Sequence, residues 1–285
     1  MNGSSRARRI SIATAFALAL VACGGRPDHV IARRVEGTLP RTDPFAAAWE
    51  DLPEHEASLA PQVVATPTLT TGSVDRVRVR ALHDGSWIAI RLEWTDATDD
   101  HNVTTSTFSD ACAFQLPHAR GAQPSPMMGN EGAPVDIVYF RASWATEDNM
   151  GELYPNMPPI YHPPEAAAEG EARTAMEAQY QVALSAHNPT VDRPEGASVV
   201  AFSAAGYGTL SPGEGGFGVD GGGTYRDGHW YAVLAREIGD TSASVVAPGQ
   251  RTSIAFAIWN GSNGEVGSRK NRSGWVDLEI EGGGS

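Results

Sequence analysis

The sequence predicts an all-β fold, an antiparallel β-sandwich. Short runs alternate between apolar and polar residues, which is the pattern of strands with one buried face. Glycine-rich and Asp-Gly turns separate these runs, as at Asp227-Gly228. Almost no stretch shows the periodicity of an amphipathic helix. Short strands separated by such turns favour two packed sheets.

The first 22 residues are expected to form a bacterial lipoprotein signal peptide. Three arginines precede an apolar run at residues 10–20, which is too short to span a bilayer. Residues 20–24 read L-V-A-C-G, which resembles the lipobox. We expect the lipid at Cys23, so that the chain is exported, held on a membrane and facing the periplasm or the cell surface. An ordinary secretory signal that contains a cysteine is the alternative.

Residues 23–60 are expected to be a lipidated tether and lead-in, with Trp49 docked on the domain. The β-sandwich domain is expected to span residues 61–285. Its first hairpin combines V-D-R-V-R-V-R at 74–80 with W-I-A-I-R-L-E-W at 87–94, because both runs alternate as half-buried strands do. Further strands are expected at residues 111–116, 135–143, 198–204, 230–237, 253–259 and 274–280.

Two stretches interrupt the strand pattern. Residues from about 145 to 196 form a long insertion, in which a proline-rich loop precedes one expected helix at 165–186. Residues 206–223 are glycine-rich and irregular, but no Lys-Ser or Lys-Thr follows them, so we expect no phosphate-binding loop. The predicted fold is therefore all-β with long loop insertions and one short helix.

The composition excludes several partners and cofactors. The sequence has 21 basic and 34 acidic residues, and its formal charge of −13 makes nucleic acid an implausible partner. No C-x-x-C-H motif occurs, which excludes covalently attached c-type haem. Cys112 lies in an apolar run and is expected to be a buried thiol.

The eight histidines do not form a metal site or a hydrolase motif. None occurs as His-x-x-x-His or Glu-x-x-His, and G-x-S-x-G is absent. His118 and His162 lie in expected loops and are kept as minor candidates for contact with a ligand. The sequence therefore predicts no catalytic residue.

A loop methionine and a solitary lysine form a possible ligand pair. Met127 and Met128 lie in a loop framed by proline and glycine. Thioether sulfur is a soft ligand that suits haem iron and raises its potential. Lys270 is the only lysine beside twenty arginines, and its amine can lose a proton and donate a lone pair to a metal. The alternatives are that the methionines fill a core and that codon bias explains the single lysine.

Several motifs follow one another over roughly residues 60–280. They read R-L-E-W-T-D-A-T-D-D (91–100), F-S-D-A-C-A-F-Q-L-P (108–117), P-M-M-G (126–129), A-P-V-D-I-V-Y-F-R-A (133–142), L-Y-P-N-M (153–157), A-A-G-Y-G-T-L (204–210), D-G-H-W-Y-A-V-L-A-R-E (227–237), I-A-F-A-I-W-N-G (254–261) and R-K-N-R-S-G-W (269–275). In this order and spacing the chain resembles the haem-b-binding gamma subunits of periplasmic molybdenum enzymes of the dimethyl sulfoxide reductase superfamily. That group includes ethylbenzene dehydrogenase, dimethyl sulfide dehydrogenase and selenate reductase.

The resemblance implies an immunoglobulin-like β-sandwich that encloses one haem b, with its iron held by a methionine and a lysine. The matching positions here are Met128 and Lys270. Met127 is the alternative ligand, because strand register decides which neighbour faces inward. Further expected haem contacts, for which core packing or surface exposure is the alternative, are Tyr139, Phe256, Trp259 and Trp275, with Arg269 and Arg272 paired to a propionate.

The resemblance also implies a function, one-electron transfer by a lipid-anchored b-type cytochrome. Such a chain is a non-catalytic subunit of, or partner to, a periplasmic molybdenum-dependent oxidoreductase. Its partners would be iron–sulfur and molybdenum subunits or a periplasmic cytochrome. The main alternative is a haem-free β-sandwich that binds a glycan or a protein, and the third is a purely structural lipoprotein.

Overall fold

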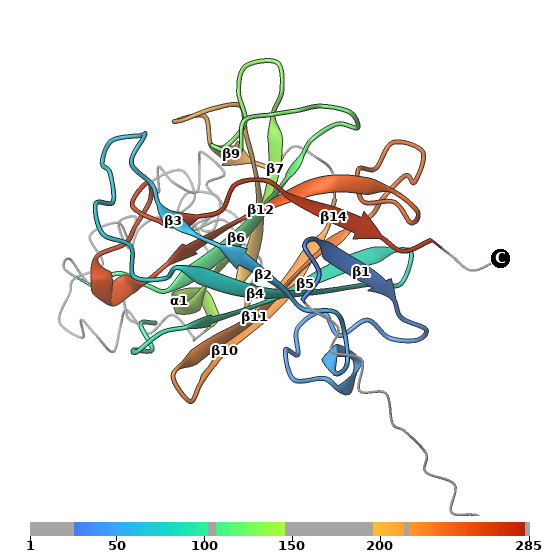
Figure 1. Cartoon of the computed structure of the whole chain (residues 1–285), viewed down its shortest axis with the longest axis horizontal. Helices are drawn as coiled ribbons and strands as arrows, with labels where there is room; N and C mark the ends of the chain where they lie inside the picture. Colours follow the sequence, from blue (N-terminus) through green and yellow to red (C-terminus); the bar gives the residue numbers. More distant parts are fainter. Residues whose placement is uncertain (1–25, 102–106, 146–195, 214–216, 283–285) are drawn as a thin grey trace, which may run out of the picture.

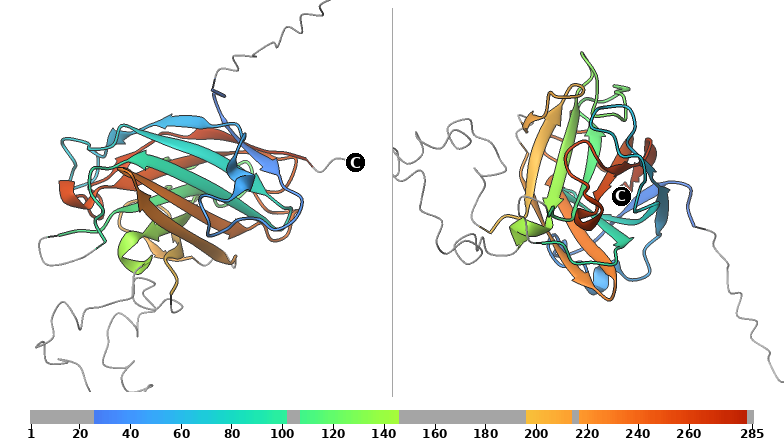
Figure 2. Two further views of the ribbon diagram at one scale, coloured as in Figure 1. Left: turned by 90° about the horizontal axis from the view of Figure 1, so that it is seen from below. Right: turned by 90° about the vertical axis from the view of Figure 1, so that its left-hand side faces the viewer.

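The structure, a computed structural model, describes residues 26–101, 107–145, 196–213 and 217–282. In these residues fourteen strands form two packed layers, which confirms the predicted all-β sandwich (Figure 1; Figure 2). Layer A contains, in spatial order, β10 (Val219–Arg226), β11 (His229–Glu237), β5 (Trp87–Thr95), β4 (Arg76–His83), β1 (Val30–Arg34) and β14 (Val276–Ile280), with β2 (His55–Ser58) also beside β4.

Layer B is smaller and carries the green and yellow strands in the right-hand view of Figure 2. It contains β6 (Ala111–Pro117), β7 (Val135–Arg141), β8 (Val199–Ala204) and β9 (Ser211–Pro212), in that order. The two short strands β13 (Asn271–Arg272) and β3 (Ala60–Pro61) pair with each other, and β13 pairs with β12.

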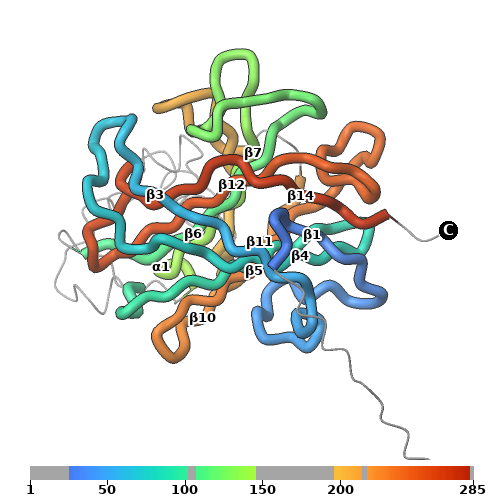
Figure 3. The backbone as a smooth tube through the Cα atoms, in the orientation of Figure 1, coloured from blue at the N-terminus to red at the C-terminus, as the bar shows by residue number. Residues whose placement is uncertain are grey.

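Strand β12 (Arg251–Trp259) belongs to both layers. Residues 251–254 pair with β14 in layer A, and residues 255–259 pair with β6 in layer B. Most strand pairs are antiparallel, as predicted, but β1 is parallel to both β14 and β4. The first and last strands of the described chain therefore lie side by side (Figure 3).

The strands predicted from alternation are present, and the first hairpin forms as β4 and β5. Strands β1, β2, β3, β9, β10 and β13 were not predicted. Three consecutive glycines interrupt the alternation in β10, within a stretch that the sequence indicates is irregular. A Cβ atom at Gly223 would collide with the ring of Phe140, so the glycine allows β10 to pack closely on layer B.

The inner core lies between the layers and includes Ile90, Trp94, Phe114 and Phe140. These side chains come from strands of both layers. Cys112 is fully buried in the same core, as predicted, and burial raises the pKa of its thiol well above the ordinary value.

The lead-in covers the outer face of layer A. Its short 3-10 helix η1 (Ala47–Trp49) places Trp49 against Leu82, Ala89 and Val233, and Trp49 is only 2% exposed. The indole Nε1 donates a hydrogen bond to the carbonyl oxygen of Asp43 at 2.9 Å. Trp49 is therefore docked on the sheet as predicted, and residues 30–61 add β1, β2 and β3 to the sandwich.

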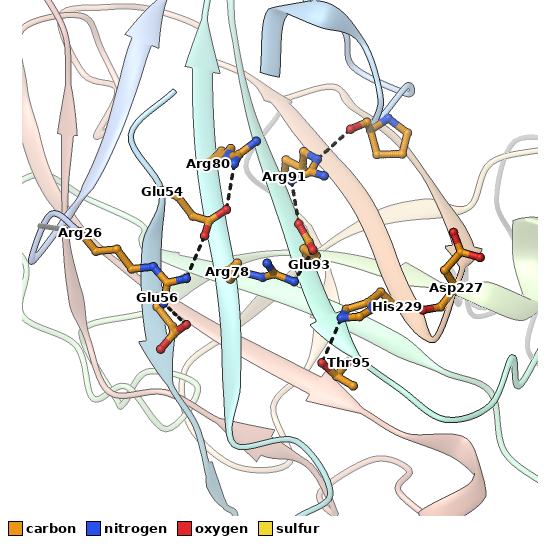
Figure 4. Close-up of polar contacts among 11 residues, drawn as sticks. Arg26, Glu54, Glu56, Arg78, Arg80, Arg91, Glu93, Thr95, Asp227 and His229 are labelled. Carbon is orange, nitrogen blue, oxygen red and sulfur yellow. Dashed lines mark hydrogen bonds and ion pairs between the residues drawn. The ribbon is translucent and has the colours of Figure 1, made fainter. Parts of the chain in front are cut away.

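Ion pairs strengthen the same side of layer A (Figure 4). Glu56 of β2 pairs with Arg26 and Arg76, and Glu54 pairs with Arg80 at 3.0 Å. On β5, Arg91 pairs with Glu93 at 3.2 Å and donates through Nε to the carbonyl oxygen of Pro44 at 2.7 Å. Lead-in and sheet are thus joined by polar contacts as well as apolar ones.

Helical structure is sparse in the described residues. The one α-helix, α1 (Ala142–Ala145), follows β7, and a second 3-10 helix, η2 (Gly261–Asn263), follows β12. The helix expected at 165–186 and nearly all of the insertion expected at 145–196 lie outside the described residues. No helix of the described part has the length and apolar character needed to cross a membrane.

Candidate functional site

A cavity of about 390 Å³ opens on the outer face of layer B. Strands β6, β7, β8 and β12 form its floor, and four loops and Arg272 of β13 form its rim. The rim loops carry exposed apolar side chains at Val64, Tyr207 and Leu210. The lining residues that the following paragraphs use are Gln62, Ala113, Gln115, Met127, Met128, Tyr139, Phe202, Ala255, Ala257, Trp259, Lys270 and Arg272.

Strand alternation and small side chains create the space. On β12, the residues Ala257 and Trp259 belong to the apolar cluster of this outer face, whereas Phe256 and Ile258 belong to the inner core. Ala113 on the adjacent strand β6 faces the same side as Ala257, with which it pairs directly. Two facing alanines leave a hollow that larger side chains would fill.

The loop between β6 and β7 places Met128 at the cavity wall. Met128 has φ +67°, a left-handed conformation that is uncommon for a residue with a side chain. Its carbonyl oxygen accepts a hydrogen bond from the backbone N–H of Gly206 at 2.8 Å. At Gly129 (φ +75°) a Cβ atom would lie 2.8 Å from the carbonyl oxygen of Ala204, so glycine is required next to Met128. The loop conformation therefore fixes the methionine backbone.

Lys270 reaches the cavity from the opposite wall. Its carbonyl oxygen accepts a hydrogen bond from the backbone N–H of Gln62 at 2.9 Å. Its Nζ donates to Sδ of Met128 at 3.6 Å and lies 5.1 Å from the ring centre of Trp259. The two side chains predicted as a ligand pair thus meet, although 142 residues separate them in sequence.

The environment of Lys270 makes its amine easier to deprotonate. Burial among apolar groups, with a smaller contribution from the positive charge of Arg272, lowers the pKa of Lys270 from 10.5 to about 8. The side chain keeps some accessible surface because it faces the cavity, while its amine lies deep within the protein. A neutral amine has a free lone pair and is able to bind a metal.

Aromatic rings surround the ligand pair. The ring of Tyr139 lies edge-on to Trp144, Phe202 and Trp259, with ring centres 5.6, 6.0 and 5.4 Å apart. Burial raises the pKa of Tyr139 to about 12. Within the part of the chain that the structure describes, the Tyr139 hydroxyl has no hydrogen-bond partner, and the residue lines the cavity. This hydroxyl is a donor available to a bound group.

The other predicted contact residues are placed as follows. Met127 lines the cavity beside Met128, and Arg272 lines it beside Lys270. Arg269 and Trp275 are not among the lining residues, and Trp275 Nε1 donates to the carbonyl oxygen of Pro124 at 2.8 Å, which fastens the methionine loop. Phe256 is also among the lining residues, although it is 2% exposed and its side chain belongs to the inner core between the layers.

Of the two minor histidine candidates, only His118 lies in the described residues, and it is not among the residues that line the cavity. His118 pairs with the buried carboxylate of Asp136 at 2.8 Å, which also pairs with Arg236. His162 and the expected lipid-bearing Cys23 lie outside the described residues. No group of three or more His, Cys, Asp or Glu side chains suited to a metal occurs in the described ranges. Among the described residues that line the cavity, the candidate metal ligands are the amine of Lys270 and the thioether of Met128.

Three buried polar residues near Lys270 were not predicted from the sequence. Gln62 donates through Nε2 to the carbonyl oxygens of Ala65 and Ser268, at 2.8 and 3.0 Å. Glu265 and Asn271 are both fully buried and hydrogen-bonded to each other at 2.8 Å. One sequence feature could have pointed to these residues. The segment before Lys270 does not alternate between apolar and polar residues, so its pattern does not show which polar side chains are exposed.

Comparisons with known proteins place the chain in a family. A putative respiratory nitrate reductase heme subunit, ORF7 of Haloferax mediterranei, is 26% identical over 235 residues, which cover 81% of this chain and 66% of that protein. The chain thus spans slightly less than two thirds of that relative's length. Two structures of a family 9 carbohydrate binding module from Caldicellulosiruptor kristjanssonii, one in complex with cellotriose and one with glucose, each align with 90% of this chain at 9% identity. The alignment covers 95% of the chain in the cellotriose complex, with a TM-score of 0.40, and 96% of the chain in the glucose complex, with a TM-score of 0.39. Residues 46–271 match the family model described as ethylbenzene dehydrogenase, and a match over this much of the sequence shows that the chain belongs to that family.

Proposed function

We propose that this protein is a non-catalytic electron-transfer subunit that binds haem b in the cavity on layer B. The observation that carries the proposal is the meeting of Lys270 Nζ and Met128 Sδ, 3.6 Å apart, inside that cavity. The family match and the heme-subunit name of the Haloferax mediterranei relative support the same assignment.

The residues present fit a haem. The cavity volume of about 390 Å³ lies within the range of about 300–1,000 Å³ typical of pockets for small molecules and cofactors. Its lining is mostly apolar, with one amine and one thioether facing each other. Lys270 and Met128 would be the residues that hold the iron, through the amine and the thioether.

Each side chain has a distinct part in the proposal. Lys270 would supply the amine, and burial has already lowered its pKa to about 8, so the proton that iron must displace is held less tightly than on an exposed lysine. Met128 supplies a soft thioether, which favours the reduced state of an iron centre. The apolar floor around Ala113 and Ala257 excludes water and thereby lowers the local dielectric. Haem iron bound there would supply a one-electron ferric/ferrous couple.

The partners are also part of the proposal. The name of the Haloferax mediterranei relative describes a heme subunit of a reductase, which favours a subunit of a multi-subunit respiratory enzyme. We propose iron–sulfur and molybdenum subunits, or a periplasmic cytochrome, as its redox partners. We propose that the chemistry on the enzyme's substrate belongs to another subunit, which the heme-subunit name of that relative favours.

We further propose that residues 1–22 are removed as a signal peptide and that Cys23 carries the lipid. The L-V-A-C-G sequence supports this assignment. Replacement Cys23→Ser should move the protein from the membrane fraction to the soluble fraction of fractionated cells. Retention of the variant in membranes that have been washed with salt and carbonate would contradict lipid attachment.

The decisive test is the reduced-minus-oxidised visible spectrum of the exported protein. The wild type should show the sharp ferrous alpha band of a six-coordinate b-type cytochrome. Met128→Ala and Lys270→Ala should each lose that band or shift it to a high-spin form, whereas Met127→Ala, the matched control, should retain it. A folded wild-type protein that binds no haem would overturn the proposal and favour a haem-free binding module.

A further inference from the structure

Glu265 is a carboxylate with an exceptional environment, since it is fully buried in the turn between β12 and β13. Its Oε1 accepts hydrogen bonds from Ser73 Oγ at 2.7 Å and Asn263 Nδ2 at 2.8 Å. Its Oε2 accepts from the backbone N–H of Asn260 at 2.9 Å and from Asn271 Nδ2 at 2.8 Å. In the described ranges no basic side chain forms an ion pair with Glu265. Neutral groups alone therefore satisfy the charge.

A buried charge without a counter-charge is costly, and an apolar side chain would fill the same space at lower cost. What the carboxylate provides is a fixed point, because hydrogen bonds to a charged acceptor are stronger and more directional than those between neutral groups. Its four donors come from three separate segments: the loop before β4, the turn that contains η2, and β13. Glu265 thus ties these segments together.

Asn271 connects this fixed point to the ligand pair, because it directly follows Lys270. Its backbone pairs with Ile258 of β12, and its Nδ2 is held by Glu265. Its Oδ1 has no hydrogen-bond partner in the described residues and lies against Gly72, where an added Cβ would collide with it. The Asn271 side chain is therefore held by a hydrogen bond to Glu265 on one side and by contact with the backbone of Gly72 on the other.

The remaining contacts restrain the other side of Lys270. Gln62 donates from its backbone N–H to the carbonyl oxygen of Lys270 and from Nε2 to that of Ser268. Trp259 Nε1 donates to the carbonyl oxygen of Gly267 at 2.9 Å. The backbone on both sides of the lysine is consequently fixed within the protein itself.

We propose that Glu265 and Asn271 are positioning residues that hold the Lys270 amine opposite Met128 before any cofactor binds. The inference rests on the proposed function in that it takes this amine to be a metal ligand. A preformed ligand does not have to be ordered when the cofactor arrives, so binding loses less conformational entropy.

Two matched variants separate positioning from general stability. Asn271→Ala and Ser73→Ala each remove one hydrogen bond to the same carboxylate, but only Asn271 adjoins the ligand. Both should lower the melting temperature of the haem-free full chain. Only Asn271→Ala should increase the rate at which an amine reagent modifies Lys270, by about tenfold, because a freed strand opens more often. Lys270 is the only lysine, so peptide mass analysis separates its modification from that of the N-terminus.

The haem-loaded protein gives a second, independent reading. Asn271→Ala should show a mixture of six-coordinate and five-coordinate spectra, whereas Ser73→Ala should keep the wild-type spectrum. If the wild-type protein binds no haem, the proposed function fails, but the labelling comparison still tests the positioning of Lys270.

If Asn271→Ala does not fold, Gly72→Ala replaces it in the test. Its added methyl group displaces the Asn271 side chain without removing any hydrogen-bond donor. It should likewise accelerate modification of Lys270. Equal modification rates in Ser73→Ala and in the variants that disturb Asn271, at equal loss of melting temperature, would overturn the proposal.

Discussion

The two outer faces of the sandwich differ in how far they are covered. On layer A, the lead-in covers the sheet, with Trp49 buried and arginine–glutamate pairs around it. On layer B, paired alanines and irregular loops leave a cavity with one lysine and one methionine in it. The comparison teaches that one face is closed and stabilises the fold, while the other keeps an open volume, in which we propose that a cofactor binds.

The largest change in the free energy of unfolding is expected from a substitution on the closed face of layer A. Trp49→Ala removes a large, almost fully buried side chain and should lower the free energy of unfolding by about 3–5 kcal/mol, measured by denaturant titration. The cavity should be unaffected, so cofactor binding at low denaturant should remain. A loss of binding in a variant that is still folded would show that the two faces are not separable.

Filling the space should distinguish the cavity from the core. Ala257→Leu points into the cavity and should change stability by less than about 1 kcal/mol while abolishing cofactor binding. The matched control Ala232→Leu, in the inner core and fully buried, should cost about 1–3 kcal/mol. Similar costs for both leucines would mean that the outer face of layer B is as tightly packed as the core.

Removing a buried basic side chain should have opposite effects on the free energy of unfolding on the two faces. Without cofactor, Lys270→Met should raise the free energy of unfolding at pH 7 by roughly 2 kcal/mol, since each unit of pKa shift is about 1.4 kcal/mol and the amine keeps some contact with the cavity. Arg91→Met on layer A should lower it, because Glu93 and the carbonyl of Pro44 lose a partner.

The pH dependence follows from the lowered pKa of Lys270. Between its folded value of about 8 and its ordinary value of 10.5, the unfolded chain binds more protons, so stability of the cofactor-free wild type should rise with pH over this window. Below pH 8 the cost of the buried charge is complete. Denaturation curves of wild type and Lys270→Met should therefore converge towards pH 10.5, and parallel curves would contradict a buried charged amine.

The smallest effect is expected from the exposed ion pairs of layer A. Glu56→Gln removes contacts with Arg26 and Arg76, both of which are largely exposed. The loss should be below about 1 kcal/mol and should shrink further in high salt. A large and salt-independent loss would indicate that these pairs, and not Trp49, close the face.

Much of the fold was predictable from residue alternation, because β4, β5 and β11 each have a buried face that the sequence displays directly. The three glycines of β10 gave no such signal, since glycine has no side chain to alternate. The parallel position of β1 between β4 and β14 depends on contacts between the two ends of the chain, and local sequence patterns do not report such contacts.

For the candidate site, the two proposed ligands could be named from the sequence, but the residues that support them could not. Met128 and Lys270 followed from their unusual chemistry and from a family resemblance, and the structure brings them together. Phe256 and Trp259 both line the cavity, but positions three apart on a strand face opposite sides, and the side chain of Phe256 belongs to the inner core. Glu265 and Asn271 depend on distant donors that sequence alone does not bring together.

Strand β1, which pairs with β14, has a consequence for how the molecule is made. The first described strand cannot complete its ladder until the last strand of the chain is available. Such a topology has high contact order and folds slowly, because distant segments must meet before either is stabilised. We therefore expect the central ladder of layer A to form late in folding, and we expect a chain truncated before β14 to expose the edges of β1 and β12 to other molecules.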